Sequence, residues 1–265
     1  KIYKNKVKPI LEREGVRFLM KVPGVNQVIM NKIRTELINA FGGEFYEVII
    51  GGAAFNKEVE TFFKKMGFPF TVGYGMTECA PIITYDDWKE EKLFSCGKAA
   101  PNMQVRIASA DPINIPGEIQ IKGANVFLGY FKNEEATAEV FTEDGWFKTG
   151  DMGILDGDGS LFIKGRTKCM ILGPSGQNIY PEEVETVVNS QPYVVDSLVI
   201  EDDGGLTALI YPDFQQGEKE GMSQEAMVKY MEGTLAELNT ILPNYARLKK
   251  IEVMSEDFER TPKKS

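Results

Sequence analysis

Apolar positions between residues 47 and 72 follow the period of a strand, then of a helix, then of a strand again. Glu47–Ile50 predicts one short strand, and Phe68–Val72 predicts a second. Between them, Asn56 can cap a helix that Gly67 ends. The apolar face of that helix holds Val59, Phe62, Phe63 and Met66. Strand, helix and strand within about 25 residues are typical of an α/β unit with a parallel pair of strands.

The pattern changes twice further along the chain. Between residues 96 and 164, Glu118–Lys122 alternates with period two, and Gly, Pro and Asp-Gly turns separate further short strands. This pattern of short alternating strands and turns predicts an antiparallel, β-barrel-like segment. After Arg166 we expect a hairpin around Gly173–Gly176 and a helix that opens at Pro181. Two strands and a long helix are expected after it, at 194–201, 207–211 and about 223–241.

These patterns predict two domains, with a boundary near Lys168. The expected fold class is α/β plus the β-barrel-like segment in residues 1–167, followed by a small α+β C-terminal domain in residues 168–265. The length of 265 residues, with 43% hydrophobic and 26% charged residues, suits two globular domains of ordinary size.

The charge balance narrows the choice of partners. Lys+Arg 30 against Asp+Glu 39 gives a net charge of −9, which repels nucleic acid and anionic membrane surfaces. The longest apolar runs, such as Val48–Ile50, are far shorter than a membrane-spanning helix, so no transmembrane segment is expected.

Histidine is absent, and this excludes several classes of enzyme. With no histidine in the chain, Ser-His and Cys-His catalytic pairs and histidine-ligated metals cannot be built. The three cysteines, Cys79, Cys96 and Cys169, are scattered and odd in number. They are typical of reduced thiols in a cytoplasmic protein.

A glycine-rich segment, Gly73–Glu78, directly follows the second predicted strand. Such a loop lets backbone N–H groups approach a phosphate, although Pro81 prevents the helix that a dinucleotide-binding fingerprint needs. The adjacent hydroxyl and carboxylate of Thr77 and Glu78 could bind phosphate and Mg²⁺. A plain turn with a solvated glutamate is the alternative.

Two acidic turns follow. In Asp144–Asp151, a carboxylate on a tight turn could accept both hydroxyls of a ribose, with a solvated hairpin aspartate as the alternative. Asp156–Ser160 resembles the start of a calcium loop. We reject a calcium site because Leu161 and Thr167 stand where an EF-hand needs glycine and glutamate.

Arg166 lies within Gly165–Lys168, and a glycine-rich hairpin and the helix from Pro181 to Glu185 follow it. A fixed arginine beside such a hairpin and a helix that opens with proline is an unusual local arrangement. The alternative is a surface arginine in a salt bridge with no role in function.

Taken in order, these motifs resemble the second half of an adenylate-forming enzyme of the acyl-CoA synthetase, adenylation-domain and luciferase superfamily. Within it, the chain is most similar to bacterial long-chain fatty-acid–CoA ligases. The residues that carry the resemblance are Tyr74–Glu78, Gly117–Ile119, Gly129-Tyr130, Thr149–Asp151 and Gly165–Lys168 through Glu185.

The resemblance implies roles for the glycine loops of the first domain, the C-terminal part of the family's large domain. Glu78 would hold Mg²⁺, and Thr77 would contact the α-phosphate of ATP. Gly52, Ala53 and Tyr74 would line the pocket for the adenine and the acyl carboxylate, and Gly75 and Met76 would be further cofactor-binding positions.

The resemblance also implies roles around the domain boundary. Asp151 would bind the ribose hydroxyls, and Arg166 would help to hold the nucleotide. Lys168 would be the hinge of a small, mobile C-terminal domain. Gly176 and its neighbours would form the tunnel for the pantetheine of CoA. The implied reaction joins a fatty acid to CoA with ATP and Mg²⁺, through an acyl-adenylate.

The sequence departs from the family pattern in two places. The upstream Ser/Thr/Gly-rich loop that grips the β- and γ-phosphates is not among these residues. Counting from Thr261 puts Ser265 in the place of the catalytic lysine, so we take the adjacent Lys264 as the candidate. We therefore expect a piece of a longer ligase that is inactive by itself.

Two other functions stay open at this point. The chain could be a nucleotide- or acyl-adenylate-binding module without turnover, or its parent could charge an acyl-carrier protein instead of CoA. We also expect some self-association, because the predicted strands Glu47–Ile50 and Phe68–Val72 would expose apolar faces or edges.

Overall fold

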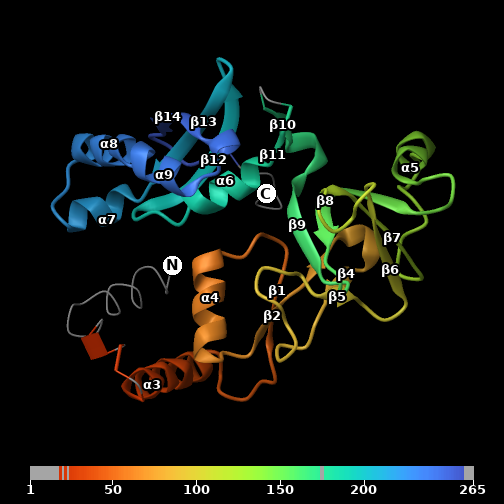
Figure 1. Ribbon diagram of the computed structural model, residues 1–265, viewed down its shortest axis with the longest axis horizontal. Helices are drawn as coiled ribbons and strands as arrows, with labels where there is room; N and C mark the ends of the chain where they lie inside the picture. Colours follow the sequence, from red (N-terminus) through yellow and green to blue (C-terminus); the bar gives the residue numbers. More distant parts are fainter. Residues whose placement is uncertain (1–17, 20, 23, 174–175, 260–265) are drawn as a thin grey trace. The chain divides into compact units, whose positions relative to one another are not determined.

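The computed structural model describes residues 18–19, 21–22, 24–173 and 176–259 (Figure 1). The described chain divides into two compact units. One comprises the residues up to 149 together with 153–163, and the other comprises 150–152 together with the residues from 164 onward. The assignment of residues 1–167 and 168–265 to a large and a small domain stays a prediction.

The first unit begins with the α/β arrangement that the sequence predicts. Its elements are α3 (Val25–Ala40), β1 (Val48–Ile50), α4 (Lys57–Met66) and β2 (Phe70–Val72). β1 and β2 are parallel (Figure 1). The Asn56 side chain caps α4 by accepting from the N–H groups of Glu58 and Val59, both at 3.1 Å. Gly67 ends the helix with a φ of 66°. The core beneath holds Met30, Phe62, Met66, Phe68, Phe70 and Val72.

Two further sheets and one helix complete the first part of the chain. The smaller sheet contains β3 (Tyr74–Gly75), β4 (Ile82–Tyr85) and β5 (Lys98–Ala99). The larger contains β6 (Met103–Ala108), β7 (Gly117–Gly123), β8 (Phe147–Leu155) and β9 (Leu161–Arg166), with α5 (Glu134–Val140) between β7 and β8. In the described residues this sheet is open, with β6 and β9 at its edges. The barrel-like closure that we expected is therefore not formed, since β6 and β9 do not pair with each other.

The second unit opens with the predicted hairpin, β10 (Ile171–Leu172) and β11 (Asn178–Ile179). α6 (Pro181–Val188) starts with proline in its first turn, as expected. The central sheet has the order β12 (Val194–Asp202), β13 (Gly205–Pro212), β14 (Leu248–Val253). Three helices complete the unit: α7 (Phe214–Lys219), α8 (Gln224–Gly233) and α9 (Leu235–Ile241).

The expectation of one helix over residues 223–241 was wrong, because the helix is divided between α8 and α9. The break falls at Gly233, a poor helix former, and at Thr234, whose hydroxyl donates to the Met231 carbonyl oxygen at 2.6 Å. Among the helices that the structure describes, none has the length and apolar character needed to cross a membrane.

Candidate active site

Two glycine-containing loops lie together at the carboxyl ends of β1 and β2. The Gly73 N–H donates to the Ile50 carbonyl oxygen at 2.8 Å. A Cβ on Gly51 would lie 3.2 Å from the Gly73 carbonyl oxygen, so the two backbones touch where Gly51 lacks a side chain. Gly52 is exposed, has a φ of 84° and faces open space. The carboxyl edge of parallel strands is where α/β proteins bind ligands.

The second loop continues into a tight turn that depends on Gly75. A Cβ at this position would lie 1.9 Å from the Pro81 carbonyl oxygen, so only glycine fits. The Met76 N–H donates to that same oxygen at 2.8 Å. Thr77–Cys79 then form a single 3₁₀ turn, and Thr77 is exposed on it. The expectation that Pro81 prevents a long helix here is confirmed.

Glu78 is held in place by a distant segment of the same unit. The Phe127 N–H donates to the Glu78 carbonyl oxygen at 2.8 Å. The Tyr130 hydroxyl donates to Glu78 Oε1 at 3.2 Å. Burial and the Glu78 carboxylate raise the pKa of the Tyr130 phenol. Sequence reasoning placed Tyr130 in a motif but did not connect it with Glu78.

The neighbouring Tyr74 and Met76 face inward. Tyr74 is buried and belongs to the core beneath β6 and β7, and Met76 packs against that core. Ala53, in contrast, is exposed on the first loop. The predicted contacts of these three residues with a ligand stay predictions.

Asp151 and Arg166, two of the predicted site residues, meet in the second unit. Arg166 Nε lies 3.6 Å from Asp151 Oδ1, and the aspartate side chain is 13% exposed against 67% for the arginine. We expected Asp151 on a tight turn, but it lies within β8. The tight turn lies earlier, where the Gly145 N–H donates to the Thr142 carbonyl oxygen.

Glu182, which sequence reasoning did not single out, supports Arg166. The Arg166 N–H donates to Glu182 Oε1 at 3.2 Å. A Cβ on Gly165 would lie 2.5 Å from Glu182 Oε2, so this glycine gives the carboxylate room. The spacing of 16 residues between Arg166 and Glu182 left no local signal of the contact.

The other predicted residues lie on exposed turns or outside the described part of the chain. Lys168 lies in the 3₁₀ turn Thr167–Cys169 and is exposed. Gly176 is exposed in the β10–β11 hairpin with a φ of 77°. Lys264 lies outside the described residues. The hinge, tunnel and catalytic roles of these three residues stay predictions.

The rejected calcium loop has a simple structural role. Lys92 Nζ forms an ion pair with Asp156 Oδ2 at 2.6 Å and a second one with Asp158. The cation between these carboxylates is therefore a lysine ammonium group from the same unit.

Comparison with known proteins identifies the family. The model of the AMP-binding enzyme matches residues 4–131, and the model of the AMP-binding enzyme C-terminal domain matches residues 170–265. The chain belongs to the AMP-binding enzyme family. The resemblance to adenylate-forming enzymes is thereby confirmed, and the relatives are acyl-CoA ligases.

The relatives of this AMP-binding enzyme differ in the acid that their names give. The chain is 29% identical over 248 residues to the long-chain-fatty-acid–CoA ligase FadD15 of Mycobacterium bovis, covering 88% of the chain and 40% of the relative. It is 36% identical over 203 residues to the 2-succinylbenzoate–CoA ligase of Bacillus cytotoxicus, covering 72% and 42%.

Solved structures of AMP-binding enzymes show the same fold. O-succinylbenzoate coenzyme A synthetase of Bacillus subtilis, in complex with ATP and magnesium ion, matches with a TM-score of 0.70 and 28% identity over 87% of this chain and 48% of its own. ATP-bound MatB from Rhodopseudomonas palustris matches with a TM-score of 0.63 and 28% identity, over 82% and 43%. The chain thus spans less than half the length of these relatives.

The donor set around Glu78 fits a magnesium ion, which the structure of the Bacillus subtilis synthetase contains together with ATP. Within the described residues, no three His, Cys, Asp or Glu side chains gather closely enough to hold a metal ion. A single carboxylate on an open turn suits Mg²⁺, which commonly takes one or two carboxylates and completes its shell with water and substrate phosphates. Thr77 adds an exposed hydroxyl beside it.

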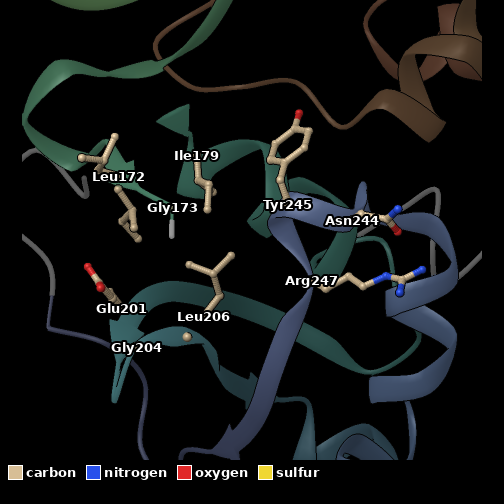
Figure 2. A pocket seen from close by; sticks show the side chains of 11 residues that line it. Leu172, Gly173, Ile179, Glu201, Gly204, Leu206, Asn244, Tyr245 and Arg247 are labelled. Atoms are coloured by element: carbon tan, nitrogen blue, oxygen red, sulfur yellow. The ribbon is translucent and has the colours of Figure 1, made fainter. Parts of the chain in front are cut away.

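The second unit of this AMP-binding enzyme contains a cavity of about 310 Å³ beside the β10–β11 hairpin. Figure 2 shows Leu172 and Ile179 of the hairpin on one side, and Tyr245 and Arg247 from the segment leading into β14 on another. Apolar side chains and several polar groups, among them Glu201 and Arg247, line this cavity together.

Proposed function

We propose that these 265 residues carry the adenylate-binding residues of an ATP-dependent acid–CoA ligase, and that the acid is a long-chain fatty acid. In the first half-reaction, a carboxylate oxygen attacks the α-phosphorus of ATP and the bond to pyrophosphate breaks. In the second, the CoA thiol attacks the acyl carbon and AMP leaves. The observation that carries the proposal is the meeting of the two glycine loops with the Glu78 turn at the ends of β1 and β2.

The first unit contributes phosphate and acyl contacts in this proposal. The exposed loop at Gly52 and Ala53 and the turn from Gly75 offer backbone N–H groups close to a ligand. Thr77 donates its hydroxyl to the α-phosphate. Mg²⁺ bound at Glu78 would neutralise charge that gathers on the phosphate oxygens during the transfer.

The second unit contributes contacts to the sugar. The Asp151 carboxylate can accept hydrogen bonds from both ribose hydroxyls. The Arg166 guanidinium lies beside it and is mostly exposed, so it can reach an anionic group while it pairs with Asp151. Glu182 fixes the backbone of Arg166 by accepting a hydrogen bond from its N–H.

Some of the relatives support this acid, and others name different acids. Long-chain-fatty-acid–CoA ligases of Mycobacterium bovis and of Saccharomyces cerevisiae are among the matches. The alternative acid is 2-succinylbenzoate, because a 2-succinylbenzoate–CoA ligase is 36% identical to this chain over 203 residues. Assay of the full-length parent with both acids separates the two.

CoA is the proposed acceptor. The cavity beside the hairpin is lined by Arg247, and a guanidinium suits the phosphates that distinguish CoA from a protein-bound phosphopantetheine. A parent enzyme that charges an acyl-carrier protein but not free CoA would establish the alternative. The three cysteines form no disulfide, which supports a reducing compartment, and we propose the cytoplasm.

The test is calorimetric titration of this chain with a non-hydrolysable acyl-adenylate analogue, with AMP and with Mg-ATP. We expect the analogue to bind and Asp151→Ala to abolish binding. Asp203→Ala is the matched control, since Asp203 lies in the same unit and pairs with Lys249 at the surface. Absence of binding to the folded wild-type chain would overturn the proposal for these residues.

A further inference from the structure

Glu91 is a buried carboxylate in a stretch of sequence that looks solvated. It belongs to the run Asp86–Lys92, in which six of the seven residues carry charge, Glu91 included. Its exposed fraction is nevertheless only 4%. It lies in the first unit and has no part in the chemistry proposed above.

The carboxylate of Glu91 bonds to the last residue of β2. The Val72 N–H donates to Glu91 Oε1 at 2.9 Å. Successive peptide groups point in opposite directions along a strand, and the N–H of Gly73 faces β1. The N–H of Val72 therefore faces the other edge of β2, where Glu91 takes the place of a neighbouring strand.

The main chain of Glu91 is also fixed. Lys64 Nζ on α4 donates to the Glu91 carbonyl oxygen at 2.6 Å. A few residues on, the Phe94 N–H donates to Glu60 Oε1, again on α4. Glu91 is thus anchored to the helix on one side and to the end of the strand on the other.

Burying the Glu91 carboxylate costs free energy. Among the described residues, Glu91 Oε2 is buried with no hydrogen-bond partner. Burial raises the pKa of the Glu91 carboxyl to about 7, against the lowering effect of the hydrogen bond from Val72; Glu60 and Asp86 add to the rise, and Lys64 opposes it. A leucine at this position would avoid the desolvation cost of a buried carboxylate, but it could not accept the hydrogen bond from the Val72 N–H.

The hydrogen bond from Val72 to Glu91 lies one residue before Gly73–Glu78, the glycine loop of the proposed site. The peptide groups at Val72 and Gly73 are held from opposite edges, by Glu91 and by Ile50. The path of the chain into Gly75 and Thr77 is fixed by these two bonds. We propose that Glu91 is a positioning residue that fixes this loop for nucleotide binding, an inference that rests on the proposed function.

The experiment compares Glu91→Leu and Glu91→Gln in the full chain. Two readouts are taken: amide hydrogen exchange at residues 73–75 without ligand, and the affinity for a non-hydrolysable acyl-adenylate analogue. Loss of one hydrogen bond should speed exchange and weaken binding by roughly fivefold to tenfold in the leucine variant. The glutamine variant keeps an acceptor and should restore both.

Glu185→Leu is the matched control, because Glu185 is also a partly buried carboxylate that accepts from a backbone N–H, but that of Val199 in the second unit. It should lower stability and leave both readouts unchanged. If the leucine variant does not fold, Glu91→Asp supplies the comparison, since its shorter side chain cannot reach Val72.

The outcomes separate the two proposals. Equal exchange and equal affinity in wild type and variants would overturn the role of Glu91 alone. A wild-type chain that does not bind the analogue would overturn the proposed function, and with it the purpose assigned to Glu91. Faster exchange and weaker binding in Glu91→Leu, restored in Glu91→Gln, would support it.

Discussion

Tyr130 donates its phenolic hydrogen to Glu78 Oε1 across 3.2 Å, although the two residues are 52 positions apart. The ring of Tyr130 packs edge-on against Phe127, with centroids 4.9 Å apart. Its N–H donates to Thr137 Oγ1 at 2.9 Å. The tyrosine is thus fixed by its own surroundings before it reaches Glu78, and it orients a carboxylate that would otherwise rotate freely on an open turn.

Tyr130→Phe should weaken the binding of Mg²⁺ with ATP and leave AMP binding unchanged. Loss of a hydrogen-bond partner behind a metal ligand commonly costs 10–100-fold in metal affinity, and we expect about tenfold at this half-exposed position. The measurement is ATP affinity with saturating Mg²⁺ and again with a chelator. Tyr211→Phe on β13 is the control. An unchanged Mg²⁺ dependence in Tyr130→Phe would contradict the role of Tyr130 in orienting Glu78.

Gly75→Ala should destabilise the first unit. The added methyl would lie 1.9 Å from the Pro81 carbonyl oxygen, so the turn would have to open. Overpacking against backbone typically costs about 1–3 kcal/mol, and we expect the upper end of that range. Urea unfolding measures the change. Gly157→Ala is the matched control, since a Cβ there meets no atom within 4 Å. Equal losses in both variants would show that the turn yields easily.

Local signals predicted the scaffold of the site well. Asn56 and Gly67 mark the ends of α4 because capping and left-handed termination act within a few residues. Pro181 likewise marks the start of α6. Interactions that span the sequence were not predictable in the same way. The contact between Tyr130 and Glu78 depends on how a loop packs on a turn, which no periodicity encodes.

Two further differences have the same origin. Glu91 looks like one charge in a solvated run, and only the packing of α4 against the end of β2 buries it. Asp151 follows a glycine in a segment rich in turn residues, yet it lies within β8 because pairing across the sheet overrides local propensity.

The second unit should lose stability as pH rises from about 4.5 to about 7 because of Glu185. Burial raises the pKa of this carboxyl from 4.5 to about 7 in the folded chain. Over that interval the unfolded chain releases the proton while the folded chain retains it, so ionisation favours unfolding. Above the folded pKa the penalty is constant.

Glu185→Gln should therefore stabilise the chain at pH 8 and have little effect at pH 5. Glutamine still accepts from the Val199 N–H, a bond of 2.8 Å in the wild type. We expect roughly 1–2 kcal/mol at pH 8, below the full linkage value because solvent partly screens a half-buried carboxylate. Denaturant unfolding at the two pH values measures it. A difference that does not vary with pH would refute the assignment.

Exposed apolar side chains around β1 should cause self-association. Ile49 is 54% exposed, and Phe41 and Tyr46 of the same unit are exposed as well. In the described residues β1 pairs with β2 alone, so its other edge is open to a second chain. Burial of an isoleucine contributes about 1.5–3 kcal/mol, so Ile49→Lys should weaken association by about tenfold or more. Sedimentation velocity over a concentration series measures it. Ile241→Lys is the control, since Ile241 is 56% exposed on α9 of the other unit. A wild-type chain that stays monomeric throughout the series would contradict the prediction of self-association. Equal association of the two variants would contradict the role of Ile49 in it.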